Sequence, residues 1–369
     1  MYILVTGGAG FIGSHTVDLL LQKGHRVRVL DALAPPVHRD GELPAYVPRE
    51  VEFIHGDVRE RAAWERALEK IDAVFHLAAY QDYLTDFSKF FHVNTVGTAL
   101  LYEIVVEKKL PLQKIVVASS QSAYGEGKYE CAEHGVQYPP LRTEAQLLRR
   151  EWDVLCALCA RPMQWLVTDE ARVTPHNQYA MSKYTQEMLA LNFGKRYSIP
   201  TVALRYSITQ GPRQSFRNAY SGILRIFTTR LLANQPPVAY EDGGQLRDYV
   251  SVHDVARANV LALEDARADY QVYNVGGGRA VTVNEYAQMI ADALGENSAP
   301  QHPGQYRFGD TRHIVSDISK LRALGWSPQV PLEKIIAEYI AWAREQPDVR
   351  DYYADAEREM LARGTLRET

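Results

Sequence analysis

The sequence predicts an α/β fold built on a doubly wound parallel sheet, with a smaller C-terminal α/β lobe and a separate insertion. In the N-terminal half, short and almost continuous apolar runs alternate with helical patterns, which is typical of strands covered by helices on both faces. A glycine-rich turn follows the first of these runs. All three cysteines fall in one segment that the alternation does not explain.

The first region, residues 1–205, is predicted to be one domain with six strands and four helices. The strands are expected at 2–6, 26–31, 51–55, 73–77, 114–119 and 201–205. The helices are expected at 12–23, 62–70, 87–108 and 178–196.

After residue 205 the pattern changes. Residues 206–346 are predicted to form the smaller lobe, with segments near 247–265 returning to the main sheet. Its helices are expected at 219–233, 254–263 and 284–294, mixed with short strands such as 272–275. The highly charged stretch 347–369 is expected to be a solvated helix or a frayed tail.

The composition excludes several classes of protein. Lys and Arg total 41 against 45 Asp and Glu, a net charge of −4, so neither a nucleic-acid partner nor an anionic membrane surface is expected. No apolar run approaches the roughly 18 residues of a membrane span, and no signal peptide is recognised before the first strand. Three cysteines are too few for a disulfide framework and favour a reducing cytoplasmic location.

The turn after the first strand has the pattern of a phosphate-binding loop. It places glycine at the first, fourth and seventh positions of Gly7-Gly8-Ala9-Gly10-Phe11-Ile12-Gly13. These glycines permit a tight turn, a close approach of backbone to a pyrophosphate and close packing of helix on strand. The helix N-terminus that follows attracts phosphate. The pattern predicts a Rossmann-type dinucleotide site containing Gly7, Gly10, Phe11, Ile12 and Gly13.

The carboxylate at the end of the second strand favours NAD as that dinucleotide. The second strand ends at Asp31, where a carboxylate accepts hydrogen bonds from the ribose hydroxyls and repels the 2′-phosphate of NADP. Asp57 and Val58 follow the third strand and are expected beside the adenine. Each aspartate is, taken alone, as typical of a loop or helix cap.

Tyr179 and Lys183 are the candidate catalytic pair. They lie four residues apart in a helical pattern and therefore share one face. A free tyrosine has a pKa of about 10, and a neighbouring ammonium together with the nicotinamide ring favours its phenolate form. Ser119 and Ser120 end the preceding strand, where a hydroxyl can share the substrate proton with Tyr179. The same spacing also occurs by chance in surface pairs.

With these residues in this order, the chain resembles the extended short-chain dehydrogenases/reductases of the NAD-dependent sugar-nucleotide epimerase/dehydratase family, from Met1 to about Trp342. The resemblance also rests on His76-Leu77-Ala78-Ala79 beside the cofactor and on Asn94 of the central helix. It implies catalytic roles for Ser120, Tyr179 and Lys183. It further implies cofactor contacts from Leu77, Ala78, Ala79, Asn94, Tyr179 and Lys183.

The resemblance implies a nucleoside-diphosphate sugar as substrate. Arg247 and Arg307 match segments whose arginines contact the diphosphate, and a guanidinium fork suits phosphate oxygens, although a single Arg is commonly a surface ion pair. The other expected substrate contacts are Ser120, Gln121, Tyr179 and Arg213. One departure stands out, because Ile208 occupies a position where family members commonly have Asn.

The residues after Ser120 favour epimerisation among the reactions of the family. Its 4,6-dehydratases carry an Asp-Glu pair there, whereas Gln121 and Ser122 cannot act as carboxylate acids or bases. We therefore expect a 4-epimerase, in which C4 is oxidised to a ketone and the hydride returns to the opposite face. The insertion and residues 44–57 resemble those of bacterial dTDP-L-rhamnose 4-epimerases.

Other functions remain open from the sequence. A UDP-hexose or UDP-uronate 4-epimerase, or an NAD-dependent sugar-nucleotide dehydrogenase or reductase, fits the same residues. A non-catalytic dinucleotide-sensing protein is a more distant alternative, since fold does not fix function. The resemblance also implies a homodimer through helices 87–108 and 178–196, but their amphipathic pattern alone serves a monomer equally well.

The insertion has the ligand pattern of a metal site. Residues 121–178 are too many for a connection in a compact domain, so an inserted subdomain is expected at 126–172. Cys131 and His134 form one pair and Cys156 and Cys159 a second, as in a tetrahedral Cys₃His zinc site. Four protein ligands make such a zinc structural and the insertion zinc-ribbon-like. The alternative is three free thiols and a surface histidine.

Overall fold

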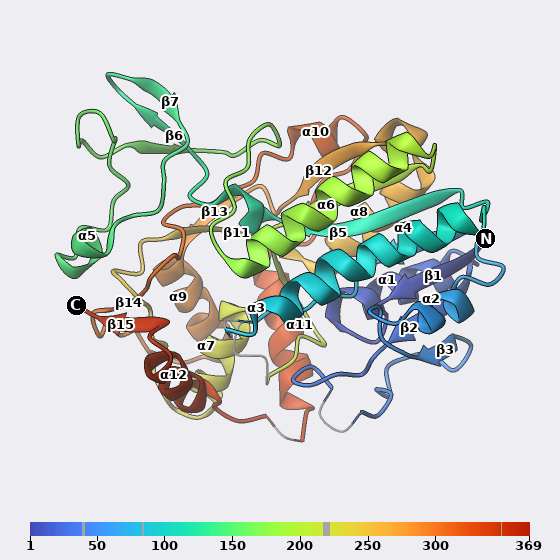
Figure 1. The fold of residues 1–369 in the computed structure, drawn as a ribbon. Coiled ribbons are helices and arrows are strands. Elements are labelled where there is room, and N and C mark those ends of the chain that lie inside the picture. The colour runs from blue at the N-terminus through green and yellow to red at the C-terminus, as the bar shows by residue number, and fades with distance from the viewer. Residues whose placement is uncertain (39–40, 83–84, 217–221, 348) are drawn as a thin grey trace.

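The fold is centred on a seven-stranded parallel sheet with helices on both faces (Figure 1). The computed structural model describes residues 1–38, 41–82, 85–216, 222–347 and 349–369. In sheet order the strands are β12 (Gln271–Val275), β9 (Thr201–Tyr206), β5 (Lys114–Ser120), β4 (Ala73–His76), β1 (Tyr2–Thr6), β2 (Arg26–Asp31) and β3 (Glu52–His55). From β1, successive strands are added first on one side (β2, β3) and then on the other (β4, β5), and this switch in strand order places a ligand crevice at the carboxyl ends of β1 and β4.

Alternate residues of each central strand point into two different cores. Ile3 and Val5 pack with one helix layer, and Leu4 packs with the other. The first layer is α1 (Phe11–Gln22) and α8 (Val252–Glu264), and the second is α2 (Arg61–Ala67), α4 (Gly97–Glu107) and α6 (Gln178–Arg196). Burial on both faces explains the continuous apolar runs in the sequence.

The predicted strands of the first region agree with the structure to within one residue at each end. The helix predicted at 87–108 forms as three consecutive segments, α3 (Phe87–Phe90), η1 (Phe91–Val96) and α4. The middle segment η1 is π-helical, a local widening that often marks functional sites. No helix among the described residues is long and apolar enough to cross a membrane.

The second lobe has its own apolar core. It is built from α7 (Ile223–Leu232), α9 (Val283–Leu294), α11 (Leu332–Arg344) and the small sheet of β10 (Ile208–Gln210), β11 (Leu246–Ser251) and β13 (Ala280–Thr282). Between these elements the chain returns to the main sheet, adding α8 and the edge strand β12, with the short η3 (Ala266–Ala268) and later α10 (Ser319–Arg322) beside them. Residues 219–221 of the helix predicted at 219–233 lie outside the described residues.

The insertion begins after a short helix, η2 (Gln121–Tyr124), and projects from the sheet (Figure 1). Its elements are β6 (Lys128–Cys131), β7 (Gly135–Gln137), α5 (Glu144–Leu148) and β8 (Gln164–Leu166). Arg142 joins it to the lobe, because both of its terminal nitrogens donate to Glu241 at 2.9 Å and its Nε donates to Glu126 at 3.4 Å. All three side chains are buried.

The C-terminal stretch differs from its prediction. It forms α12 (Tyr353–Ala362) and β15 (Leu366–Glu368), and β15 pairs antiparallel with β14 (Gln305–Arg307). Tyr353 and Met360 are each 7% exposed and Leu366 is 1% exposed. The expectation of a solvated or frayed tail is therefore wrong for this inner face. A high overall charge conceals the few apolar residues that lie at helical spacing.

Candidate active site

A cavity of about 320 Å³ opens at the carboxyl ends of the central strands. It gathers nearly all of the residues predicted to contact a dinucleotide. These are Gly7, Gly10, Phe11, Ile12, Gly13, Asp31, Asp57, Val58, Leu77, Ala78, Ala79, Tyr179 and Lys183.

The glycine-rich turn leaves no room for side chains. Gly7 has a φ of +68°, and a Cβ built on it would lie 2.8 Å from the backbone of Ala78. A Cβ on Gly13 would lie 2.0 Å from the carbonyl oxygen of Gly7. The turn therefore packs directly against α1 and β4, as a dinucleotide fold requires, and the N-terminus of α1 faces the cavity with its free N–H groups.

The two acidic residues of the cavity are oriented by their neighbours. The carboxylate of Asp31 accepts hydrogen bonds from the backbone N–H groups of Ala9 at 3.0 Å and Leu33 at 2.9 Å. Burial raises the pKa of Asp57, but hydrogen bonds from the side chain and backbone of Arg59 outweigh burial and lower it overall. Both groups can therefore accept hydrogen bonds as carboxylates.

Asn94 is not among the described residues that line this cavity, and its contact with the cofactor stays a prediction. Its side chain is fully buried, and it accepts from the backbone N–H of Tyr80 at 2.8 Å and donates to the Tyr80 carbonyl at 3.0 Å. It also donates to Ser182 Oγ of α6 at 2.9 Å. Its π-helical setting in η1 lets it hold the wall of the cavity against α6, one layer behind the cofactor.

Tyr179 lies where this cavity meets a second one of about 380 Å³, and its side chain lines both. Lys183 lines the first cavity and Ser120 the second. The two serines at the end of β5 differ in their hydrogen bonds. The hydroxyl of Ser119 donates to the carboxylate of Glu187 at 2.7 Å. The hydroxyl of Ser120 contacts only its own turn among the described residues, accepting from Ser122 N at 3.2 Å.

Lys183 is almost completely buried, and burial lowers its pKa to about 7 although the carboxylate of Glu187 opposes the shift. Its ammonium donates to the side-chain oxygen of Gln186. The lowered pKa brings the titration of this lysine close to neutral pH. A ligand that supplies hydrogen-bond acceptors would favour its ammonium form.

A chain of buried side chains, which no sequence motif predicted, continues from Lys183 to the first strand. Gln186 donates to Thr98 Oγ1 at 3.0 Å, and Thr98 Oγ1 lies 3.0 Å from His76 Nε2. His76 Nδ1 in turn lies 2.8 Å from Thr6 Oγ1. Burial lowers the pKa of His76 to about 3, so the histidine is neutral and connects the catalytic helix to the strand before the glycine turn.

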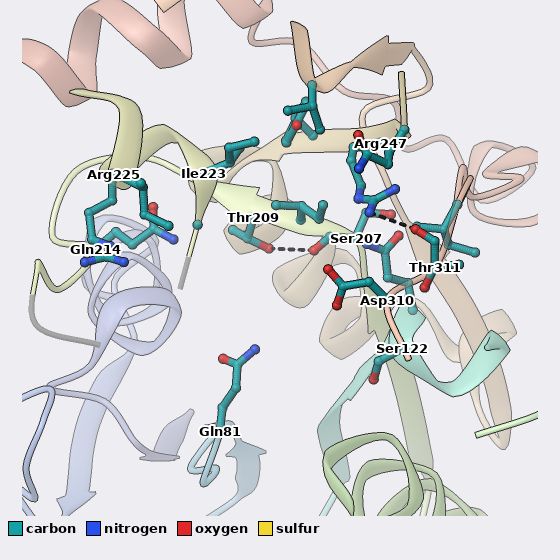
Figure 2. Close-up of a pocket in the computed structure, with 18 of the residues that line it drawn as sticks. Gln81, Ser122, Ser207, Thr209, Gln214, Ile223, Arg225, Arg247, Asp310 and Thr311 are labelled. Atoms are coloured by element: carbon teal, nitrogen blue, oxygen red, sulfur yellow. Dashed lines mark hydrogen bonds between the residues drawn. The ribbon is translucent and has the colours of Figure 1, made fainter. Parts of the chain in front are cut away.

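The second cavity lies between the main sheet and the lobe. Arg247, Asp310 and Thr311 are on one side, opposite Gln214 and Arg225, with Gln81 below (Figure 2). Arg247 donates to the carbonyl oxygen of Thr311 at 2.8 Å, and Arg307 pairs with Asp310 at 2.7 Å. The predicted residues Ser120, Gln121, Tyr179, Arg247 and Arg307 all line this cavity.

Arg213, also predicted to bind substrate, lines neither cavity. Its guanidinium pairs with Asp18 of α1 at 2.8 Å and lies 4.8 Å from the ring centroid of Tyr46. Gln214, the next residue, lines both cavities instead. Arg225 of α7 also lines the second cavity, and it lies outside the segments that the resemblance identified. Ile208 lines the cavity as well.

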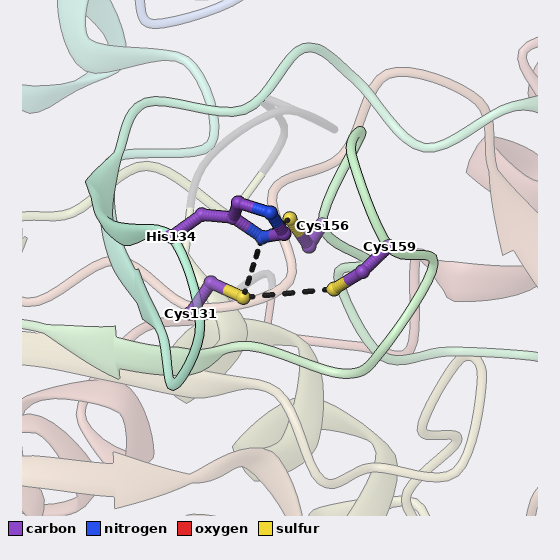
Figure 3. Close-up of side chains that lie close together, drawn as sticks. All are labelled: Cys131, His134, Cys156 and Cys159. Carbon is purple, nitrogen blue, oxygen red and sulfur yellow. Dashed lines mark hydrogen bonds between the residues drawn. The ribbon is translucent and has the colours of Figure 1, made fainter.

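The three cysteines and His134 form one cluster at the outer end of the insertion (Figure 3). Their four ligand atoms all lie within 4.8 Å of one another. Cys131 Sγ is 3.5 Å from His134 Nδ1 and 3.7 Å from Cys159 Sγ, and Cys156 Sγ is 3.6 Å from the same nitrogen. The folded chain thus brings together all four predicted metal ligands from two separate loops.

Comparisons with known proteins agree with this geometry. Residues 3–145 match the profile of the NAD dependent epimerase/dehydratase family, and residues 162–339 match that of GDP-mannose 4,6 dehydratase. A dTDP-L-rhamnose 4-epimerase of Burkholderia thailandensis is 33% identical over 94% of this chain and 96% of its own. The chain belongs to the NAD-dependent epimerase/dehydratase family.

Other members of the epimerase/dehydratase family are similar over the same length. A putative UDP-glucose 4-epimerase of Methanocaldococcus jannaschii is 31% identical over 93% of this chain and 98% of its own. The crystal structure of a Thermotoga maritima UDP-glucose 4-epimerase with UDP-glucose has a TM-score of 0.76 at 30% identity, covering 94% of this chain and 99% of its own. The Thermus thermophilus UDP-glucose 4-epimerase in complex with NAD has a TM-score of 0.72 at 31% identity, with coverage of 94% and 99%.

Proposed function

We propose that this protein is an NAD-dependent nucleoside-diphosphate-sugar 4-epimerase. The observation that carries the proposal is the position of Tyr179, which faces both cavities with Lys183 on the cofactor side and Ser120 on the substrate side. In this proposal residues 1–205 hold NAD, and residues 206–346 close the substrate cavity.

The lining of the substrate cavity favours epimerisation over dehydration. Elimination of water needs a free acid and a free base beside the sugar. Among the described residues of the cavity, Asp310 is the one carboxylate, and it is paired with Arg307. Gln121 and Ser122 are the two residues that follow Ser120 in the sequence, and both line the cavity.

The reaction then follows from the roles of three side chains. Tyr179 removes the proton of the 4-hydroxyl group while Ser120 hydrogen-bonds the same oxygen. Lys183 in its charged form favours the phenolate of Tyr179. Bound NAD accepts the hydride from C4 and later returns it. The 4-keto sugar turns within the cavity before Tyr179 gives the proton back, so that the new hydroxyl points to the opposite face.

The proposed substrate is dTDP-L-rhamnose, as the name of the Burkholderia relative suggests. UDP-hexoses are the alternative, because the names of several other relatives refer to UDP-glucose. The purified protein should be incubated with both kinds of nucleotide sugar and followed by NMR for the C4 epimer. We expect an equilibrium mixture without net formation of NADH, whereas stoichiometric NADH would instead indicate a dehydrogenase.

Replacing the proposed base tests the mechanism directly. Tyr179→Phe removes the phenolic oxygen and should lower kcat by about 10³-fold or more, without weakening NAD binding. Tyr197→Phe is the matched control, because that side chain is 46% exposed at the end of α6. Normal turnover in the Tyr179 variant would refute the proposed mechanism.

We further propose that the Cys/His cluster holds a structural zinc ion. In a tetrahedral site, Zn–S and Zn–N bonds of about 2.3 and 2.0 Å place two sulfurs about 3.8 Å apart and a sulfur about 3.5 Å from a nitrogen. Three of the six pairs have separations close to these values: 3.7 Å between Cys131 Sγ and Cys159 Sγ, and 3.5 and 3.6 Å from His134 Nδ1 to Cys131 Sγ and Cys156 Sγ. All six separations are within 4.8 Å. Gln137 Nε2 and Leu158 N donate to Cys156 Sγ, as expected around a metal-bound thiolate.

Metal analysis of the protein as purified should find one zinc ion per chain. His134→Ala should lower this content and increase proteolysis within the insertion, because a small subdomain depends on its metal. His302→Ala is the control, since that histidine is exposed and bonds to Asn284 at 2.9 Å. A metal-free protein whose insertion resists protease equally well would rule out the zinc.

The same enzyme is proposed to be a homodimer. Helices α4 and α6 lie side by side at the surface (Figure 1). Val96, the last residue of η1 before α4, and Met181 and Met188 of α6 are each at least 40% exposed. An apolar strip of this kind is suited to burial against a second copy. Light scattering should give twice the chain mass, and Met188→Glu should reduce it toward that of one chain.

A further inference from the structure

The C-terminal segment 349–369 packs against the substrate cavity, although the family profiles end at residue 339. Tyr353, Ala356 and Met360 of α12 all line that cavity. Because they are three and seven residues apart, they form a single face of the helix. The other side of α12 is solvated, as Ala354 and Leu361 are exposed.

Contacts with Arg307 show which end of the cavity α12 occupies. Leu366 of β15 lies opposite Arg307 of β14 in an antiparallel pair. The guanidinium of Arg307 lies 5.3 Å from the ring centroid of Tyr240, and the hydroxyl groups of Tyr240 and Tyr353 are hydrogen-bonded. The segment is therefore at the arginine end, where α12, β14 and β15 lie together (Figure 1).

The substrate cavity meets the cofactor cavity at Tyr179, which lines both. Tyr353, Ala356 and Met360 line only the substrate cavity among the described surfaces. A nucleotide sugar is a linear molecule of sugar, diphosphate and nucleoside. If its sugar is at Tyr179 and its diphosphate is at Arg247 and Arg307, its nucleoside extends toward α12.

Both neighbouring parts of the molecule hold this segment in place. Arg230 of α7 pairs with Asp351 at 3.3 Å, and its guanidinium lies 4.5 Å from the ring centroid of Tyr353. From the insertion, Arg150 donates to Thr369 Oγ1 at 2.9 Å and Glu144 pairs with Arg367. The inner face of α12 is thus presented to the cavity as a fixed surface.

We propose that this face of α12 is the wall of the nucleoside subsite and determines how tightly the nucleotide part of the substrate binds. The polarisable thioether of Met360 and the ring of Tyr353 suit contact with an aromatic base, and the small Ala356 leaves space for it. The proposal rests on the proposed function, because it takes a nucleoside-diphosphate sugar as the substrate.

Filling the space at Ala356 tests the wall. In the NAD-loaded full-length enzyme, Ala356→Trp should raise KM for the nucleotide sugar and Kd for thymidine diphosphate by about tenfold or more, with kcat within about twofold. Ala354→Trp places the same indole on the exposed side and should change neither constant. Uridine diphosphate, tested in parallel by calorimetry, measures the preference of the subsite for the base.

Met360→Ala provides a second and milder test. Loss of the thioether contact should weaken thymidine diphosphate binding by about three- to tenfold, whereas Leu361→Ala, on the exposed side of the same helix, should not. NAD affinity shows whether each variant is folded. If the Ala356→Trp variant does not fold, the Met360→Ala variant alone tests the proposed subsite. Unchanged affinity for thymidine diphosphate in a folded Met360→Ala variant would overturn the proposal that α12 forms the wall of the nucleoside subsite. If the unmodified enzyme shows no epimerisation but its affinity for thymidine diphosphate still depends on Met360, the proposed function is refuted and the nucleoside subsite is not.

Discussion

The central sheet and the insertion are held together by different forces. The sheet buries long runs of Val, Leu and Ile between two helix layers, so its stability comes mainly from nondirectional apolar burial. The insertion has a small core around Tyr129, Val154 and Met163, and it depends on four potential metal ligands and on the buried Arg142. The core of the sheet therefore tolerates exchange among apolar residues, whereas the insertion requires particular side-chain atoms at particular places.

Replacing Arg142 should have the largest effect on the stability of the insertion. Arg142→Met leaves Glu126 and Glu241 buried without their main partner, which should cost about 3–5 kcal/mol. The free energy of unfolding, measured by denaturant titration, should fall by that amount, and protease should cut first within the insertion. Arg149→Met is the control, because its exposed pair with Glu151 should contribute less than about 1 kcal/mol.

A cavity in the core of the sheet should lower the free energy of unfolding by a similar amount, but this loss should not depend on a metal. Leu4 is fully buried in β1, and Leu4→Ala should lower the free energy of unfolding by about 2–5 kcal/mol. The loss should be the same with or without a zinc chelator, because no metal supports this core. A chelator-dependent cost for Leu4→Ala would mean that the two regions are not held independently.

Changing pH distinguishes the cofactor site from the insertion. The folded pKa of Lys183 is about 7, below its value in the unfolded chain. Between pH 7 and about 10 the unfolded state therefore binds more protons, and the free energy of unfolding rises with pH by at most about 1.4 kcal/mol per unit. Below pH 7 the penalty for the buried ammonium is fully present. The difference in stability between the unmodified enzyme and Lys183→Met, without NAD, should show this slope.

Helix caps give the smallest effect and the finest comparison. Asn177 caps α6 by accepting from Ala180 N at 2.8 Å, and Thr143 caps α5 by accepting from Gln146 N at 3.3 Å. Replacing either with Ala should cost about 1 kcal/mol. We expect Asn177→Ala to lower the free energy of global unfolding. We expect Thr143→Ala to speed hydrogen exchange in the insertion alone. Equal global effects would show that the insertion unfolds together with the sheet.

The sequence predicted the sheet and the lining of the cofactor cavity well because both follow local rules. Apolar strands, a glycine turn and Tyr179 with Lys183 on one helix face each depend on neighbours within a few residues. Arg213 and Asn94 do not line the two cavities, because a motif does not show which way a side chain turns in the folded chain. Arg213 pairs with Asp18, and Asn94 is hydrogen-bonded to the backbone of Tyr80.

The remaining features arise from contacts between distant parts of the chain. Arg225, the Gln186–Thr98–His76 connection and the inner face of α12 become visible only when several elements meet. Spacing within one segment carries no information about them. The Cys/His cluster is the exception, because its ligand spacing predicted that two distant loops would come together.

The return of the chain to the main sheet also bears on how the molecule moves. Strand β12 and helix α8 are reached only after the chain has passed through part of the lobe, so the two halves are connected by several crossings of the backbone. Such interlacing resists wide hinge opening about a single linker. Access to the nicotinamide must then come from small, local rearrangements at the rim, and heating should melt both halves in a single cooperative transition.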